Sequence, residues 1–332
     1  MLHFLEDVNT SGKKVYNLSS WGSALGDQQC SVRKLSLGDE TMGHIQGLLE
    51  GGINTSVVEL DLCNKGLNTL NVTSLAGKFT ALKTLNVSRN EGLELEGGLK
   101  GFEEVDLSET MMELSGVVVE DVKILTFKNN TFHGEAADGS LGGLEGLDLQ
   151  GTKMDVCKAV SVMSCFRGVN LNLSDCLKVS DEDASAFDGV VVDTIVELNI
   201  SGNDVTAAAG SLVGCVGRCG NLKVLDVSNT GVRDWGGEEA KGILEIEGLD
   251  TLRVFGNRIG EGSGWFKDNK VERRGWLECL GEGIKGGRWK ALDLGGNNFG
   301  SKEVNEILGW AGEGETRMEV LEIGGNTMNQ ER

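Results

Sequence analysis

Cysteines, histidines and a glycine-rich segment are the first residues to test for a catalytic or metal site in this chain. Cys157, Cys165 and Cys176 lie close together in the sequence, but their spacing is not that of zinc ligands and no histidine is nearby. The three histidines belong to no Ser, Cys or carboxylate constellation of the kind that a triad requires. The segment "GEGSG" at 260–264 lacks the Lys-Ser/Thr of a phosphate-binding loop. The sequence therefore predicts no catalytic residue, no metal site and no cofactor.

Charged residues recur in one fixed arrangement along the chain. Asp61 lies between Leu60 and Leu62, and the six other residues named below lie between two aliphatic residues in the same way. If two aliphatic residues of a strand face a core, the residue between them faces the other way, so these side chains would share one face of a sheet. A ladder of carboxylates on one surface attracts a basic partner. The partner-binding residues predicted on this face are Asp61, Asp106, Asp148, Asp226, Arg253, Asp293 and Glu322.

These residues belong to a repeat that runs along the chain. "LKTLNVSRN" from Leu82, "LKVLDVSNT" from Leu222 and "MEVLEIGGN" from Met318 each fit apolar-x-x-L-x-L-x-x-N. Twelve segments fit, and all of them are apolar in the fourth and sixth places. The ninth place holds Asn, Thr or Cys in every segment except two, which have Glu40 and Lys65. The segments start at Val32, Val57, Leu82, Phe102, Val122, Leu144, Gly168, Ile195, Leu222, Leu249, Trp289 and Met318.

This pattern resembles the leucine-rich repeat family over about residues 32 to 332. The segment "LNLSDCLKVSD", Leu171 to Asp181, is similar to the cysteine-containing subtype, and the later repeats look like the ribonuclease-inhibitor subtype. The resemblance implies an α/β solenoid, or horseshoe, with a parallel concave sheet and with helices and loops on the convex side. It also gives the carboxylate ladder a purely structural alternative, because Asp is common at this place in the family.

Domain organisation and secondary structure follow from the repeat spacing. Residues 1–31 are interpreted as an N-terminal cap with a degenerate repeat, "VYNLSSWGSAL", and residues 32–332 as the solenoid. Strands are expected from the fourth to the sixth place, for example Leu35–Leu37, all in one sheet. Repeats of 20 residues at Leu82 and Phe102 leave little room for a helix, whereas those of 24 to 29 residues later in the chain have room. Helical periodicity is present in 180–187, 211–219 and 301–311.

One interval is much longer than the others. Leu249 to Trp289 spans 40 residues, and the excess lies near 261–274. Aromatic residues beside Arg are typical of interface hot spots, so this insertion is predicted to contact a partner. The alternative is a longer helix with a tucked Trp. The predicted contact residues are Trp265, Phe266, Lys267, Lys270, Arg273 and Arg274.

Composition narrows the class of partner and the location. The 332 residues carry a formal charge of −20, so no direct nucleic-acid partner is expected and a basic protein surface fits better. The alternative is that the charge only maintains solubility. There is no run of apolar residues that could span a membrane and no secretory signal, so the sequence favours an intracellular protein, in the cytoplasm or an organelle, that is not secreted.

The C-terminal edge is the last predicted contact. After Asn326 only "TMNQER" follows, so Leu321, Ile323 and Met328 are expected to lack a covering repeat. Either the chain is a fragment, or the edge pairs with a second copy, or another subunit covers it; the last is favoured.

The function predicted from these observations is a non-enzymatic scaffold for protein–protein interaction, as a subunit of a larger assembly. The alternatives are the substrate-recognition component of a ubiquitin ligase and a regulator of a small GTPase.

Overall fold

Short parallel strands and their connections build two compact units. The computed structural model describes residues 7–9, 31–37, 53–113, 117–132, 141–232, 237–260, 270–313 and 317–326. The first unit is Met1–Thr152 and the second is Lys153–Arg332. Within the described residues, no helix has both the length and the hydropathy that crossing a membrane requires.

The first unit is organised around a sheet of three-residue strands. Each strand pairs in parallel with the next one along the sheet, and the fourth-place residues are partners, as Leu60 and Leu85 show. In spatial order the strands are β1 (Asp7–Asn9), β2 (Lys34–Ser36), β3 (Glu59–Asp61), β5 (Thr84–Asn86), β8 (Glu104–Asp106), β10 (Ile124–Thr126) and β11 (Gly146–Asp148).

The second unit repeats this arrangement with longer connections. Its strands also pair in parallel, with Leu225 opposite Leu252 and Leu252 opposite Leu292. In spatial order they are β13 (Asn170–Asn172), β15 (Glu197–Asn199), β16 (Val224–Asp226), β17 (Thr251–Arg253), β18 (Ala291–Asp293) and β19 (Val320–Glu322).

The predicted strands are confirmed with a shift of one residue. Each strand covers the third to fifth places, and not the fourth to sixth. The sixth-place residue continues the ladder through its backbone, since Leu62 N donates to Asn86 O at 2.7 Å. Residues in the fourth and sixth places are buried in every described repeat except the last, where Leu321 and Ile323 are partly exposed. These residues form the core of each unit.

Strand β1 was not predicted. Val8 pairs with Leu35, so residues 7–9 form one more strand before the first predicted repeat. The repeat pattern missed it because its sixth place is the polar Thr10. The predicted degenerate repeat from Val15 to Leu25 lies outside the described residues.

On the side away from the sheet, the described residues of the first unit form little helix, as the 20-residue repeats predicted. Short strands take its place, and the helix α3 (Val72–Lys78) is the one α-helix among the unit's described residues. These strands pair as β4 (Thr69–Asn71) with β6 (Glu94–Glu96) and β7 (Leu99–Lys100) with β9 (Val119–Glu120).

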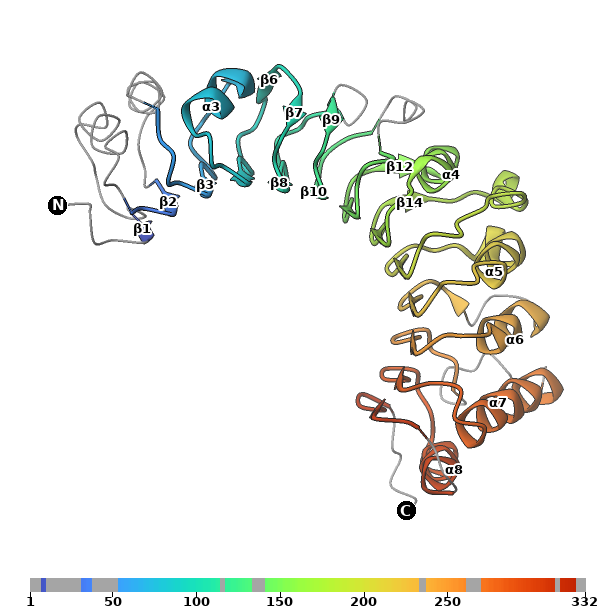
Figure 1. Ribbon diagram of the computed structural model, residues 1–332. Coiled ribbons are helices and arrows are strands. Elements are labelled where there is room, and N and C mark those ends of the chain that lie inside the picture. The colour runs from blue at the N-terminus through green and yellow to red at the C-terminus, as the bar shows by residue number, and fades with distance from the viewer. Residues whose placement is uncertain are drawn as a thin grey trace. The chain divides into compact units, whose positions relative to one another are not determined.

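The longer repeats of the second unit hold helices. Figure 1 shows the strands along one side of the coil and the helices along the other. The helices are α4 (Val156–Cys165), α5 (Ala209–Gly217), α6 (Gly237–Glu245), α7 (Lys270–Lys285) and α8 (Ser301–Gly312), and β12 (Met154–Asp155) pairs with β14 (Leu177–Lys178) on the same side.

The predicted helices at 211–219 and 301–311 are confirmed as α5 and α8, but the one at 180–187 is wrong. Residues Asp181–Asp183 form a single 3-10 turn, η3, and a second such turn, η4 (Thr206–Ala208), precedes α5. At η3, both the backbone N and Oγ of Ser180 donate to Asp183 Oδ2. The acids that suggested a helix start therefore close a turn.

Most described cysteines are buried, as predicted for small core residues. Cys215 and Cys219 lie on the buried face of α5. Cys63 and Cys165 are only partly buried, and Cys157 is exposed on α4. Helices α6 and α7 pack through Trp276, whose indole N–H donates to Ala240 O at 3.2 Å.

Where the ninth place is Asn, its side chain fastens the repeat to the one before it. Asn90 donates from Nδ2 to Leu62 O at 3.0 Å and to Val87 O at 2.7 Å. Its Oδ1 accepts from the backbone N of Lys65 and of Leu67. One buried amide thus satisfies backbone groups of two successive turns, as buried polar groups require. The same donation to the sixth-place carbonyl of the previous repeat is made by Asn130, Asn203, Asn257, Asn297 and Asn326.

The turn just before this amide needs a left-handed backbone. The eighth-place residue has a positive φ throughout, whether it is Asn64 (55°), Arg89 (59°) or Gly202 (73°). Asn and Gly tolerate this region best, which accounts for their frequency at the eighth place.

We expect Asn90→Ala to destabilise the first unit by roughly 3 kcal/mol, because the change leaves three buried backbone groups, Leu67 N, Leu62 O and Val87 O, and the partly buried Lys65 N without this partner. Urea unfolding of wild type and variant measures the loss. Asn68→Ala is the matched control, since Asn68 is exposed and its side chain makes no hydrogen bond with a described residue. Equal stability of the two variants would contradict the fastening role of Asn90.

Candidate protein-binding site

The predicted partner-binding residues lie together on one face of each sheet. We call the face that carries the third, fifth and seventh places the open face. The fifth-place acids stand at the last residue of their strands, as Asp61 does in β3 and Asp226 in β16. Asp61 and Asp226 are half-buried, whereas Arg253 and Glu322 are exposed.

Each fifth-place Asp or Asn closes a small turn with its own backbone. Asp106 Oδ1 accepts from Ser108 N at 2.9 Å, and Asp226 Oδ1 accepts from Ser228 N at 2.9 Å. Asn199 makes the same bond to Ser201 N with its amide oxygen. This Asx turn satisfies the seventh-place N–H, so a fifth-place acceptor stabilises the repeats that have one. The other members are Asp61, Asn86, Asp148, Asn172 and Asp293.

Because Asn and Asp close the turn equally well, the turn does not explain the negative charge. In Asp61, Asp106, Asp226 and Asp293 the turn takes Oδ1, and Oδ2 has no hydrogen-bond or ion-pair partner among the described residues. Asp148 differs, since its Oδ2 pairs with Lys128 Nζ at 2.9 Å. The fifth-place ladder thus presents accessible carboxylate oxygens on both units.

Other open-face residues add to the negative charge. At the open-face places of the first unit's described repeats and in β1, six acids and two lysines give a net charge of −4. At those of the second unit, four acids and Arg253 give −3. The lysines are both paired, Lys34 with Glu59 at 2.8 Å and Lys128 with Asp148. The acids counted are Asp7, Glu59, Asp61, Glu104, Asp106 and Asp148, then Glu197, Asp226, Asp293 and Glu322.

The fold class can be stated from these contacts. In-register strands, a left-handed eighth place and an inward amide that reaches back one turn recur together along both units. The chain has the fold of a leucine-rich-repeat solenoid. Solenoids of this kind form extended surfaces that can bind a partner.

Comparisons with known proteins show distant likeness only. No protein-family model matches the sequence, and no curated protein matches it significantly. Among solved structures, the structure of this chain is similar to that of a TLR13–ssRNA13 complex. The two chains share 13% identity with a TM-score of 0.48, and the match covers 90% of this chain and 42% of that one. It is also similar to an internalin (inlF) from Listeria monocytogenes, with 12% identity and a TM-score of 0.40 over 100% of this chain and 84% of that one. The chain therefore spans less than half the length of the TLR13 chain.

The structure describes the predicted insertion only in part. Trp265, Phe266 and Lys267 lie outside the described residues, so their partner contacts stay a prediction. Lys270, Arg273 and Arg274 belong to the first turns of α7. At 16 residues this helix is longer than the 12-residue α8. Part of the extra length is therefore helix, as the alternative interpretation held, and the aromatic residue described as buried there is Trp276.

The predicted C-terminal edge is likewise only partly described. Leu321 and Ile323 are partly exposed, unlike the equivalent Leu292 and Leu294 of the preceding repeat. Met328 lies outside the described residues. A covering subunit stays a prediction.

A second charge pattern, which sequence reasoning missed, lies at the second place of the repeats. We call the edge that carries this place the flank. Its charges alternate in sign along each unit, and two neighbouring couples form ion pairs, Lys83 Nζ with Glu103 Oε1 at 2.6 Å and Lys290 Nζ with Asp250 Oδ2 at 2.9 Å. The alternation is visible in the sequence once the second places are aligned: Lys83, Glu103, Lys123 and Glu145, then Lys223, Asp250, Lys290 and Glu319.

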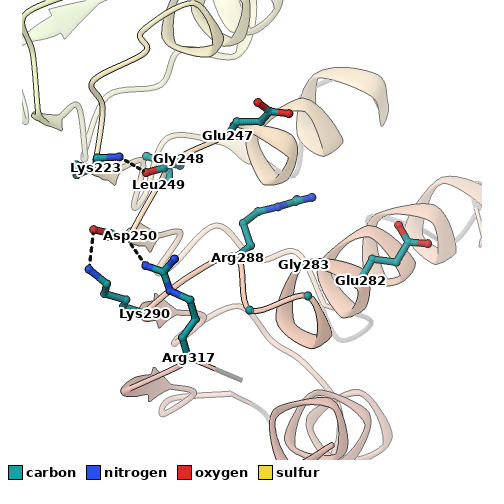
Figure 2. Close-up of a pocket in the computed structure, with 12 residues that line it drawn as sticks. Lys223, Glu247, Gly248, Leu249, Asp250, Glu282, Gly283, Arg288, Lys290 and Arg317 are labelled. Carbon is teal, nitrogen blue, oxygen red and sulfur yellow. Dashed lines mark hydrogen bonds and ion pairs between the residues drawn. The ribbon is translucent and has the colours of Figure 1, made fainter. Parts of the chain in front are cut away.

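On the second unit this flank borders a polar cavity of about 520 Å³ beside the end of α7. Asp250 binds two cations there, Lys290 Nζ and Arg317 Nη2, each at 2.9 Å (Figure 2). Lys223 Nζ donates to Gly248 O at 3.0 Å, while Arg288 points away from Asp250 and donates to Leu244 O. Each of these cations already has a partner, so the cluster serves to join successive repeats. Among the described residues, no group of three His, Cys, Asp or Glu could hold a metal ion.

The hydrogen bond from Lys290 holds the pKa of Asp250 below its usual range, and the charges of Lys290, Arg317 and Lys223 add to this effect. A lowered pKa in the folded state means that ionised Asp250 stabilises the fold above its ordinary pKa. That contribution is lost as pH falls through the lowered value.

We expect Asp226→Asn to leave stability unchanged, since the amide oxygen keeps the turn, and Asp226→Ala to cost about 1 kcal/mol for the lost hydrogen bond. Urea unfolding of both variants tests the difference. If Asp226→Ala is as stable as Asp226→Asn, the Asx turn is not what the fold requires at this place.

We expect Asp250→Asn to lower the melting temperature at pH 7 and low salt, and less so in high salt, because its ion pairs are partly exposed and screened. The difference from wild type should also shrink as pH falls below the ordinary Asp pKa of about 4 and then through the lowered pKa of Asp250. Asp188→Asn is the control, an exposed acid whose side chain has no partner among the described residues. A loss that is independent of both salt and pH would mean that the ion pairs do not cause it.

Proposed function

We propose that this protein is a non-enzymatic interaction scaffold whose open face binds a basic surface of a protein partner. The observation that carries the proposal is the divided use of the fifth-place carboxylates. Oδ1 of Asp106 and of Asp226 serves the fold, while Oδ2 is left for a ligand. An amide would serve the fold equally well, as Asn86 shows. The charge therefore has a use other than stability, and attraction of a cationic partner is the one that electrostatics supports.

The charges of the flank and of the open face differ in whether they are paired, and the difference supports the proposal. On the flank, acids alternate with bases, and Glu103 and Asp250 form ion pairs with Lys83 and Lys290. On the open face, the acids Asp106 and Asp293 form no ion pair with a described residue. Paired charges tie repeats together, and unpaired carboxylates of one sign leave a field that a partner can neutralise.

The test uses a random peptide display library selected on the immobilised protein at physiological salt. Selected peptides are then synthesised and their affinities measured by fluorescence anisotropy. We expect net-basic peptides whose binding weakens as salt rises. Replacing Asp61, Asp106, Asp226 and Asp293 together by Asn should weaken them about tenfold or more, because four charges are lost and the turns are kept.

The control variant removes the same number of charges elsewhere. Glu91, Glu182, Asp188 and Glu306 are exposed and lie outside the strands. Their replacement by Gln or Asn should leave peptide affinity unchanged if position matters, and should weaken it equally if only net charge matters. Selection of peptides without excess positive charge, or equal binding to wild type and the open-face variant, would overturn the proposal.

A further inference from the structure

The repeat that starts at Leu249 breaks the open-face pattern in two adjacent places. Its fifth place is Arg253, which has no acceptor and cannot close the Asx turn. Its seventh place is Phe255, where Ser228 stands in the preceding repeat and Ser201 in the one before that. The N–H of Phe255 therefore lacks the bond that Ser228 N makes with Asp226. A repeat that lacks this stabilising hydrogen bond, and has no other bond in its place among the described residues, is a candidate for function.

Arg253 is an unpaired cation among carboxylates. Its strand position is in register with Asp226 on one side and Asp293 on the other. Nevertheless it forms no ion pair with either residue, and Oδ1 of each aspartate is bound to backbone N–H. The side chain is exposed and has no partner among the described residues. Its planar group of five donors is thus available to a ligand.

Phe255 is an exposed aromatic side chain that the next repeat is shaped to accommodate. It is 44% exposed. A Cβ added to Gly295 would lie 2.8 Å from its Cδ2, and one added to Gly296 would lie 3.1 Å from its Cε2 and Cζ. The ring therefore lies against a pair of glycines that could carry no side chain there. Gly296 also has a φ of 62°, a region that glycine favours, and a Cβ on Gly295 would also lie 3.0 Å from Gly324 O and 3.1 Å from Asp293 Oδ1.

We infer that Arg253 and Phe255 are the selective contact of the open face, and that they bind a partner segment with a carboxylate beside an apolar side chain, flanked by basic residues. The inference deepens the proposed function and rests on it. A carboxylate can take two parallel hydrogen bonds from the Arg253 guanidinium, and an apolar side chain can cover the exposed ring of Phe255.

The surrounding charges make the contact selective as well as attractive. A uniformly basic segment would meet repulsion at Arg253, and a uniformly acidic one would meet it at Asp226 and Asp293. The segment that satisfies all three side chains has one acid between bases. It would be held in one register along the face, because its acid has no other cation on the open face of this unit's described residues.

The experiment exchanges charges between the protein and a defined probe. The probe is a peptide selected from the display library as above, synthesised with its acidic residue either retained or replaced by Lys. Wild type should prefer the acidic form by about tenfold, and Arg253→Glu should reverse that preference. Phe255→Ala should weaken both forms by about tenfold. The matched controls are Arg218→Gln, an exposed Arg on the helix side, and Val191→Ala, whose side chain is 59% exposed.

The outcomes separate this inference from the proposed function. Peptides that lose affinity for the four-Asn open-face variant, but bind the Arg253 and Phe255 variants as tightly as wild type, overturn the inference and leave the proposed function standing. Binding that is insensitive to the four-Asn variant removes both. Thermal unfolding of both variants is measured beside wild type, because Arg253→Glu places a carboxylate between Asp226 and Asp293 and Phe255→Ala removes a ring that lies against Gly295. Both variants should remain folded at the temperature of the binding assay, so that a loss of affinity arises at the contact.

Discussion

The need to satisfy backbone groups buried at the end of each strand governs the whole structure. A turn that enters the core brings N–H and C=O groups with it, and unpaired groups there cost more than most packing contacts gain. The ninth-place amide meets that need by bonding its own turn and the turn before it, as Asn257 does with Val254 and Val227. Each repeat therefore completes its neighbour. Register, strand order and the left-handed eighth place follow, because the amide reaches both turns only in that geometry.

The same requirement on the outer side produces the binding face. The seventh-place N–H lies near the surface, and an Asp or Asn at the fifth place satisfies it. A hydrogen-bond acceptor at the fifth place meets this need whether or not its side chain is charged. Asn172 and Asp226 are equivalent for the fold and different for a ligand. Charge on the open face can thus change without loss of the solenoid, which is how one repeat can serve many partners.

The sequence predicted the repeats well because alternation of apolar residues and the ninth-place amide are both local signals. It missed β1, where Thr10 interrupts the apolar pattern, and it misread 180–187, where acids close a turn and do not start a helix. The fifth-place acids were identified, but their turns were not. The ion pairs of the flank were not predicted, because their partners are far apart in the chain: Lys290 is 40 residues from Asp250, and Arg317 is 67 residues from it.

The distribution of charge, more than its total of −20, distinguishes the surfaces of this protein. Where opposite charges alternate between successive repeats, they neutralise one another within the molecule, and the flank is close to neutral. Where acids stack on acids, no internal partner is near, and the field extends into solvent within about a Debye length of 8 Å. Arg253 is informative because it is placed where pairing would be easiest, in register between Asp226 and Asp293, and yet pairs with neither. A cation that only neutralised its neighbours would be expected to contact them, as Lys128 contacts Asp148. Its outward position, beside an aromatic ring supported by glycines, is better accounted for by a contact with another molecule.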